Sequence, residues 1–129
     1  MKFCRLVNKK NAITNAMRLL RCSKRSVHAT MDIQSEIDSP LPKKYHALIT
    51  QRAKHGIHIY RYVYGTKPMF NKIKNNYEGV QMCYGGSMNR YQRMLIIDKK
   101  MGMLGLGGNI FLTQFEPLIK SLLDYAKIK

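Results

Sequence analysis

The clearest hydrophobic pattern in the chain runs from Ile57 to Tyr64, where side chains of two kinds alternate with period two. This alternation predicts a β-strand with one face that is aliphatic apart from an arginine and another that is almost wholly aromatic. The two faces are Ile57, Ile59, Arg61 and Val63, and His58, Tyr60, Tyr62 and Tyr64. If the aliphatic face packs inward, the tyrosines face a partner. If the tyrosines pack inward, Arg61 is free to contact a phosphate.

Similar alternation predicts three further strands, over residues 80–84, 91–97 and 103–112, and the turn at residues 85–87 would join the first two as a hairpin. Helical spacing of apolar residues predicts short helices over residues 43–55 and 68–77. A capping box formed by Thr113 and Glu116 predicts that a C-terminal amphipathic helix begins at Thr113. We therefore expect an α+β fold, in which a small antiparallel sheet is covered by short helices and the C-terminal helix.

The N-terminal segment is basic and free of acidic residues. Residues 1–31 hold eight Lys and Arg and no Asp or Glu, and apolar side chains recur at helical spacing between Asn11 and Leu20. This composition resembles that of mitochondrial transit peptides. Residues 18–23 resemble presequences that are trimmed in two steps, with a mature start near His28, whereas Arg25 before Ser26 resembles a single-step site. A basic arm that stays attached and binds nucleic acid is the alternative.

These patterns predict three regions. Residues 1–27 would be a transit peptide, and the protein would reside in the mitochondrial matrix. Residues 28–42, where acids are mixed with serines and prolines, are expected to form an extended linker. Residues 43–129 would form a single small α+β domain.

Charge narrows the class of partner. The chain has 23 Lys and Arg against 7 Asp and Glu, a formal net charge of +16, and without the N-terminal segment it would still have 15 against 7. Such an excess favours polyanionic partners such as RNA. No apolar run is long enough for a membrane-spanning helix, although peripheral contact with an anionic membrane stays open.

We find no motif that predicts catalysis, a cofactor or a metal site. Three cysteines are spaced neither as a disulfide framework nor as a zinc site, and Gly56 separates His55 from His58. The glycines between residues 102 and 108 do not follow the order of a nucleotide-binding loop, and close backbone packing is their expected use. We therefore expect a protein that is not an enzyme, with no catalytic residues, no cofactor and no metal.

RNA binding is the favoured function, because strand tyrosines could stack on bases while nearby cations neutralise phosphates. The candidate RNA-binding residues are Arg52, Lys54, Tyr60, Arg61, Tyr62, Tyr64, Lys67, Arg90 and Arg93. The expected role is a mitochondrial ribosomal subunit or another structural component of a matrix ribonucleoprotein, bound to rRNA and neighbouring proteins. The alternative is an accessory or assembly subunit of an inner-membrane respiratory complex or ATP synthase, and a small matrix enzyme comes third.

Overall fold

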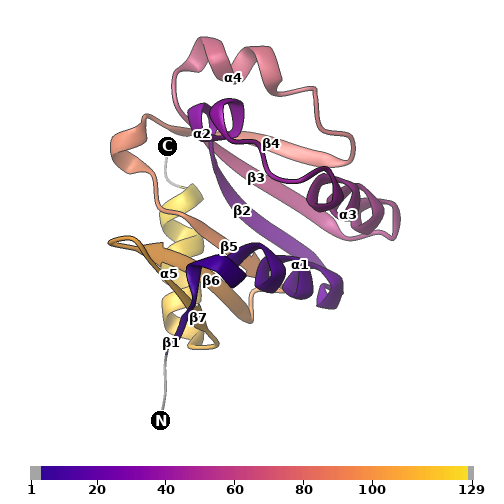
Figure 1. Cartoon of the computed structure of the whole chain (residues 1–129). Helices are drawn as coiled ribbons and strands as arrows, with labels where there is room; N and C mark the ends of the chain where they lie inside the picture. The colour runs from indigo at the N-terminus through magenta and orange to yellow at the C-terminus, as the bar shows by residue number, and fades with distance from the viewer. Residues whose placement is uncertain (1–3, 128–129) are drawn as a thin grey trace.

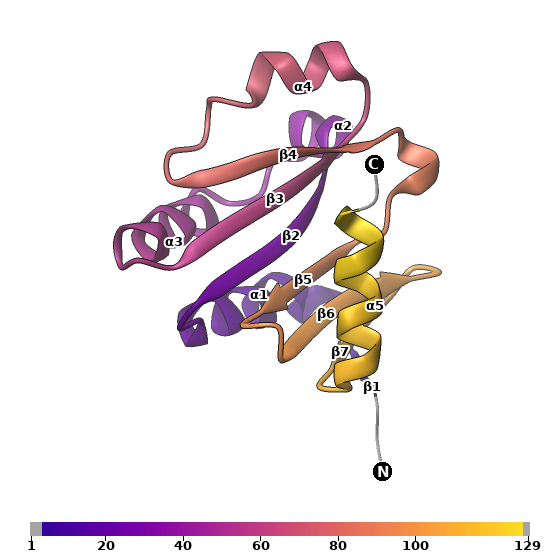
Figure 2. The same cartoon turned by 180° about the vertical axis from the view of Figure 1, so that it is seen from behind.

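The computed structural model describes residues 4–127, which form one seven-stranded sheet with helices on both faces (Figures 1 and 2). The strands are β1 (Cys4–Val7), β2 (Ser26–Asp32), β3 (His58–Tyr64), β4 (Val80–Gly86), β5 (Met94–Ile97), β6 (Met101–Leu106) and β7 (Asn109–Thr113). The α-helices are α1 (Ala12–Cys22), α2 (Ile33–Asp38), α3 (Lys43–Lys54), α4 (Lys67–Ile73) and α5 (Glu116–Lys127), with 3₁₀ turns at η1 (Lys9–Asn11) and η2 (Met88–Arg90).

The strand order is β1-β7-β6-β5-β2-β3-β4, and the sheet is mixed. β2, β3 and β4 are parallel, while the remaining neighbours are antiparallel. The expected α+β class, with helices packed on a sheet, is confirmed, but the expectation of a small antiparallel sheet was wrong. Parallel neighbours need a crossover, and here α2 with α3, and then α4, supply the two crossovers.

The predicted hairpin of residues 80–84 and 91–97 was also wrong. β4 lies at the edge of the sheet beside β3, whereas β5 pairs with β2 and β6. Residues 103–112 form a hairpin of β6 and β7 around the Gly107–Gly108 turn, where both glycines have positive φ. The turn predicted at residues 85–87 was also wrong, because Gly85 and Gly86 are the last residues of β4 and only Ser87 separates this strand from η2. The chain then crosses to β5 on the other side of β2.

The two faces of the sheet carry separate apolar layers. α1 and α3 cover one face, and α5 covers β5, β6 and β7 on the other (Figures 1 and 2). β3 lies between β2 and β4 and is buried on both sides, because Ile59 and Val63 pack on one face while Tyr62 and Tyr64 pack on the other. The tyrosine face of this strand is therefore not free for a partner.

The structure gives no support to a separate targeting segment. Residues 4–27 provide β1, α1 and the start of β2, and β1 pairs with β7 at the edge of the sheet. Leu19 and Leu20 of α1 belong to the apolar layer shared with α3, and Leu20 is 0% exposed. The amphipathic pattern that suggested a presequence is therefore explained by packing on the sheet.

The expectation of an extended linker at residues 28–42 was wrong. Most of β2 and the whole of α2 lie in this range. Asp32, which suggested a solvated loop, is the N-cap of α2, since its carboxylate accepts hydrogen bonds from the backbone N–H groups of Gln34 and Ser35.

The C-terminal helix begins three residues later than predicted, at Glu116. Thr113 ends β7, and its hydroxyl oxygen accepts a hydrogen bond from the backbone N–H of Phe115 at 3.1 Å. Among the described residues, none of the helices is both long enough and apolar enough to cross a bilayer.

A buried histidine lies beneath α5. The ring of His28 on β2 stacks on Tyr60 with centroids 4.8 Å apart, and its Nδ1 lies 2.9 Å from the hydroxyl oxygen of Tyr62. Burial, helped by the charges of Lys127 and Lys99, lowers the pKa of His28 to about 4. The imidazole is therefore neutral at pH 7 and acts as a core residue.

Candidate anion-binding site

A cavity opens where β2 and β5 separate. The two strands pair only between residues 27–29 and 95–97. Beyond this pairing, the hydroxyl of Thr30 donates to the carbonyl of Gln92 at 2.7 Å and accepts from the N–H of Met94 at 2.9 Å. A side chain thus replaces the backbone ladder, and a cavity of about 310 Å³ lies beside it. We call it the arginine cavity, because Arg61 and Arg93 both line it.

Arg61 is a buried cation without a buried counter-ion. Its side chain belongs to β3 and is 4% exposed, and its guanidinium carbon lies 5.1 Å from the centre of the Tyr77 ring. Among residues 4–127, no carboxylate lies within ion-pair distance of it. Burying a cation in this way costs free energy that the contact with an aromatic ring only partly offsets. An anion entering the cavity would supply the missing opposite charge.

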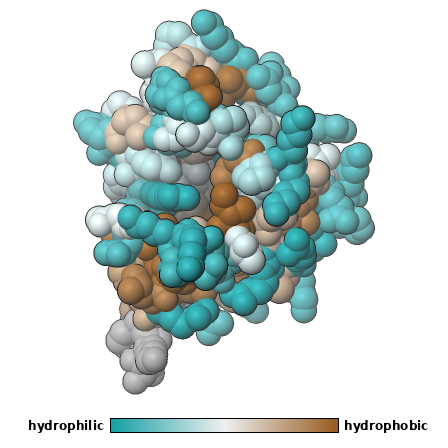
Figure 3. All heavy atoms as spheres, in the orientation of Figure 1, coloured by the Kyte–Doolittle hydropathy of each residue, from teal (hydrophilic) through white to brown (hydrophobic). Residues whose placement is uncertain are grey.

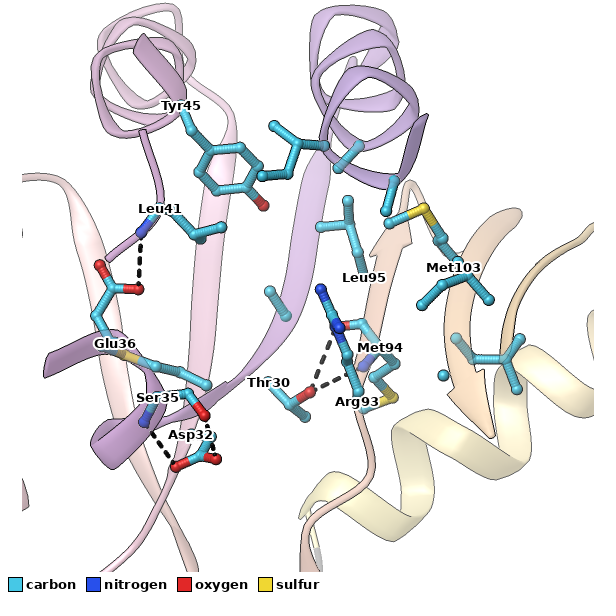
Figure 4. A pocket seen from close by; sticks show the side chains of 18 of the residues that line it. Thr30, Asp32, Ser35, Glu36, Leu41, Tyr45, Arg93, Met94, Leu95 and Met103 are labelled. Atoms are coloured by element: carbon cyan, nitrogen blue, oxygen red, sulfur yellow. Dashed lines mark hydrogen bonds between the residues drawn. The ribbon is translucent and has the colours of Figure 1, made fainter. Parts of the chain in front are cut away.

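Arg93 precedes β5 and extends into the cavity from the opposite side, as Figure 4 shows. Gly105 of β6 leaves room for it, since a Cβ atom there would lie 3.3 Å from the Cδ of Arg93. Tyr45 of α3 directs its hydroxyl into the same space (Figure 4). Burial raises the pKa of Tyr45, the charges of Arg61 and Arg93 oppose that rise, and the charge of Glu36 adds to it, so both cations and this carboxylate act on the same hydroxyl.

The two carboxylates that line the cavity already have partners. Asp32 accepts from the hydroxyl of Ser35 at 2.7 Å in addition to capping α2. Glu36 lies 2.9 Å from the Nε2 of His46 and accepts a long, 3.5 Å hydrogen bond from the N–H of Leu41. Because these acids are held by other groups, the arginines keep capacity for an outside anion.

A second hollow continues from the cavity toward the N-terminal part of the chain. It has a volume of about 450 Å³ and shares five residues with the arginine cavity, which are Ala12, Ile13, Arg93, Gly105 and Ile110. Its other end is formed by Lys9 and the turn at Gly107 and Gly108, so we call it the glycine-turn groove. The amine of Lys9 lies 3.4 Å from the position that a Cβ of Gly108 would occupy. Cations are therefore found along the whole path from Lys9 past Arg93 to Arg61.

The surface around this path is mixed in character. Figure 3 views the side of the molecule that carries α1 and α3, and brown apolar atoms lie in the middle of this surface with teal hydrophilic side chains around them. A ligand on this face would thus meet apolar walls and charged side chains together, as is common in binding sites.

Only two of the nine predicted RNA-binding residues meet in the cavity, namely Arg61 and Arg93. Tyr62 and Tyr64 are 6% and 1% exposed under α5, and Tyr60 is half-buried against His28. Since a base needs an open ring face, these tyrosines do not form the stacking surface that their alternation suggested. Their role is to pack the sheet against the helix.

The remaining predicted cations are dispersed. Arg52 donates hydrogen bonds to the backbone and hydroxyl oxygens of Ser23, and Lys54 is exposed at the end of α3. The amine of Lys67 lies 4.7 Å from the ring centre of Tyr84, and the guanidinium of Arg90 lies 4.9 Å from that of Tyr125. Arg52 and Lys54 lie at the end of α3, Lys67 lies on α4 and Arg90 lies in η2, so the four residues do not form one surface.

Sequence reasoning missed several residues of the site. Tyr45 was assigned only to a helix face, Thr30 to a linker and Lys9 to a removable segment, because nothing in their local patterns shows that β2 and β5 separate here. The glycines between residues 102 and 108 were interpreted as places of close packing. That interpretation agrees with Gly105, where the absence of a side chain leaves room for Arg93.

The side chains that line the cavity include two arginines, two carboxylates and several hydroxyl groups, but no histidine, cysteine or lysine. Among residues 4–127, no group of three or more His, Cys, Asp or Glu is placed to hold a metal ion.

Comparisons with known proteins find similar folds among solved structures but no similar sequences. No protein-family model matches the chain, and no curated protein matches its sequence. Among solved structures, it is similar to TrmBL2, an archaeal chromatin protein with a novel mode of DNA binding (TM-score 0.69, 10% identity, 98% of this chain). The chain spans about half of that protein, 51% of its length.

Two bacterial proteins have the same fold over nearly their whole length. They are Nuc from Salmonella typhimurium, a phospholipase D family member (TM-score 0.68, 10% identity), and NucT from Helicobacter pylori (TM-score 0.66, 15% identity). In both comparisons 96% of this chain is matched to 91% of the other. The sequences are so different that the likeness concerns the fold alone.

Proposed function

We propose that this protein is a non-enzymatic, RNA-binding structural component of a ribonucleoprotein, most specifically a mitochondrial ribosomal subunit. The observation that carries the proposal is the pairing of buried Arg61 with Arg93 in one cavity whose carboxylates are already engaged. A phosphate group satisfies two guanidinium groups better than any neutral ligand, because their planar forks match its oxygens.

The glycine-turn groove extends this phosphate site into a path for a polymer. Lys9 and Arg93 are both exposed and lie along the groove, so they can neutralise successive phosphates of a strand. The bare backbone at Gly107 and Gly108 lets such a strand approach closely. The net charge of +16 supplies long-range attraction for any polyanion. The resemblance in fold to a chromatin protein that binds DNA is a further, weaker support.

The mitochondrial setting rests on the acid-free N-terminal residues alone. Because α1 is part of the apolar core, we propose that these residues remain on the folded protein and that Lys9 contributes to RNA binding. The proposal combines the two interpretations of the N-terminal segment, a targeting segment and an attached basic arm, since one basic segment can guide import and later bind nucleic acid.

The salt dependence of RNA affinity tests the proposal. Each phosphate contact with single-stranded RNA contributes about −0.7 to the slope of log K against log salt. Replacing Lys9 and Arg93 together by Gln should therefore reduce the magnitude of the slope by about 1.4 and weaken binding about 25-fold at 0.1 M salt. Fluorescence anisotropy with a single-stranded RNA measures both quantities.

The matched control removes two positive charges elsewhere. Lys72 and Lys74 are exposed at the end of α4, away from the groove, and their replacement by Gln should change the slope little. If both double variants weaken binding equally, the protein binds RNA through overall charge and the groove assignment is wrong. If the unmodified protein binds no RNA at low salt, the proposed function is wrong.

Sedimentation of an organelle lysate tests the assembly. We expect cosedimentation with ribosomal subunits that is lost after ribonuclease treatment. Migration with a detergent-solubilised respiratory complex, unaffected by ribonuclease, would contradict the ribosomal proposal.

A further inference from the structure

We propose that the arginine cavity receives the terminal phosphate monoester of an RNA strand, whose chain then leaves through the glycine-turn groove. This inference rests on the proposed RNA binding and adds to it a preference for one chemical end. It assigns a role to Arg61, which lines the arginine cavity but not the glycine-turn groove.

The first argument is access. The side chain of Arg61 is 4% exposed, so a ligand reaches it only by inserting into the cavity between α1, α2, α3 and the sheet. An internal phosphodiester carries a chain on both sides and would need two exits. The cavity is continuous with one groove, through the residues that both hollows share. A strand end needs only that one exit.

The second argument is charge. A phosphate monoester carries about −1.5 to −2 charges at pH 7, whereas a phosphodiester carries one. Arg61 and Arg93 present two permanent positive charges to the cavity, while Asp32 and Glu36 are held by Ser35 and His46. Neither carboxylate forms an ion pair with the two arginines, so a monoester can present two negative charges to both guanidinium groups, whereas a diester presents one.

The third argument is size and hydrogen bonding. A volume of about 310 Å³ is many times what one water molecule needs, and it accommodates a phosphate and part of its nucleotide. The hydroxyl of Tyr45 points into this space and can donate to a phosphate oxygen (Figure 4). Apolar side chains, among them Leu95 and Met103, form the walls against which the attached sugar would rest.

Competition binding with four RNAs of one sequence tests the inference. The RNAs carry a 5′-phosphate, a 3′-phosphate, hydroxyl groups at both ends, or no ends because they are circular. We expect one of the two phosphorylated RNAs to compete at least tenfold better than the hydroxyl-ended and circular forms, and the preferred end gives the direction of the strand.

Variants then assign the preference to the cavity. Arg61→Gln should reduce the preference for the phosphorylated end to less than twofold, while hydroxyl-ended RNA still binds through the groove. Arg61→Lys should keep part of this preference. Arg18→Gln, which removes an exposed arginine from α1, should leave it unchanged. Should Arg61→Gln fail to fold, the comparison of the four RNAs with the unmodified protein still decides.

The outcomes separate this inference from the proposed function. Equal competition by all four RNAs would refute end recognition and leave the groove proposal intact, whereas absence of RNA binding would refute both. Stronger competition by vesicles of phosphatidic acid than by either phosphorylated RNA would assign the cavity to a lipid phosphate and overturn the inference.

Discussion

Leu20 offers the most direct test of the fold, because the presequence interpretation and the structure disagree about it. The side chain lies on α1, is 0% exposed and packs in the layer shared by α1, α3 and the sheet. In a cleaved presequence, Leu20 would be absent from the folded protein and its replacement would leave stability unchanged. In the structure described above, Leu20→Ala creates a cavity in the core.

The magnitude follows from this burial. Replacing a fully buried leucine by alanine costs about 3 to 5 kcal/mol, from lost transfer free energy and from the cavity that remains. For a domain of this size, each kcal/mol lowers the melting temperature by about 4 °C. We therefore expect Leu20→Ala to lower the melting temperature of the full chain by about 10 to 20 °C.

Thermal unfolding followed by circular dichroism, together with urea unfolding, measures the effect. The control is Arg18→Ala on the exposed side of the same helix, which should change stability by less than about 0.5 kcal/mol. A chain that starts at His28 lacks β1 and α1 and should not fold cooperatively. If this shortened chain unfolds at the temperature of the full one, or if Leu20→Ala has no effect, residues 4–27 do not belong to the core.

Two further predictions concern buried polar groups. Because the pKa of His28 is depressed to about 4 in the folded protein from a usual 6.5, its contribution to stability is present above pH 6.5 and is lost as pH falls toward 4, by about 3 kcal/mol. Urea unfolding at pH 7 and pH 4 measures this loss, and a His28→Phe variant that declines as much as the unmodified protein would contradict it. Arg61→Met should raise the free energy of unfolding by about 1 kcal/mol, since it removes a buried charge while keeping apolar volume. A loss of 3 kcal/mol in urea unfolding would mean that Arg61 stabilises the fold instead.

Elements with a local signature could be predicted from the sequence. The strand of residues 57–64, the helix that became α3 and the class of fold all follow from period and composition. β2 could not be recognised, because this strand is buried on both faces by the sheet's helices and lacks the alternation of a half-exposed strand. The N-cap at Asp32 was then interpreted as a linker, since short polar residues favour caps and loops alike.

Pairing and burial were harder to predict than the elements themselves. A strand sequence does not specify its neighbour, so nothing in Val80–Gly86 distinguishes an edge position beside β3 from a hairpin with β5. The candidate site depended on this pairing. Arg61 lies on β3 and Arg93 lies directly before β5, two strands that are not neighbours, and the cavity between them exists only because β5 is placed beside β2.

The position of Arg61 links stability to binding. On a strand with one buried face, this arginine would either reach the solvent at the rim or point outward, and in both cases its charge would cost little. β3 is instead covered on both faces, so Arg61 stays among Ile59, Val63 and their neighbours, with the Tyr77 ring as its cation–π partner. A methionine of similar volume would fill the same space without the cost of desolvating a charge. Retention of a destabilising cation is readily explained if an anion binds to it, and the cavity shared with Arg93 is where that anion can enter.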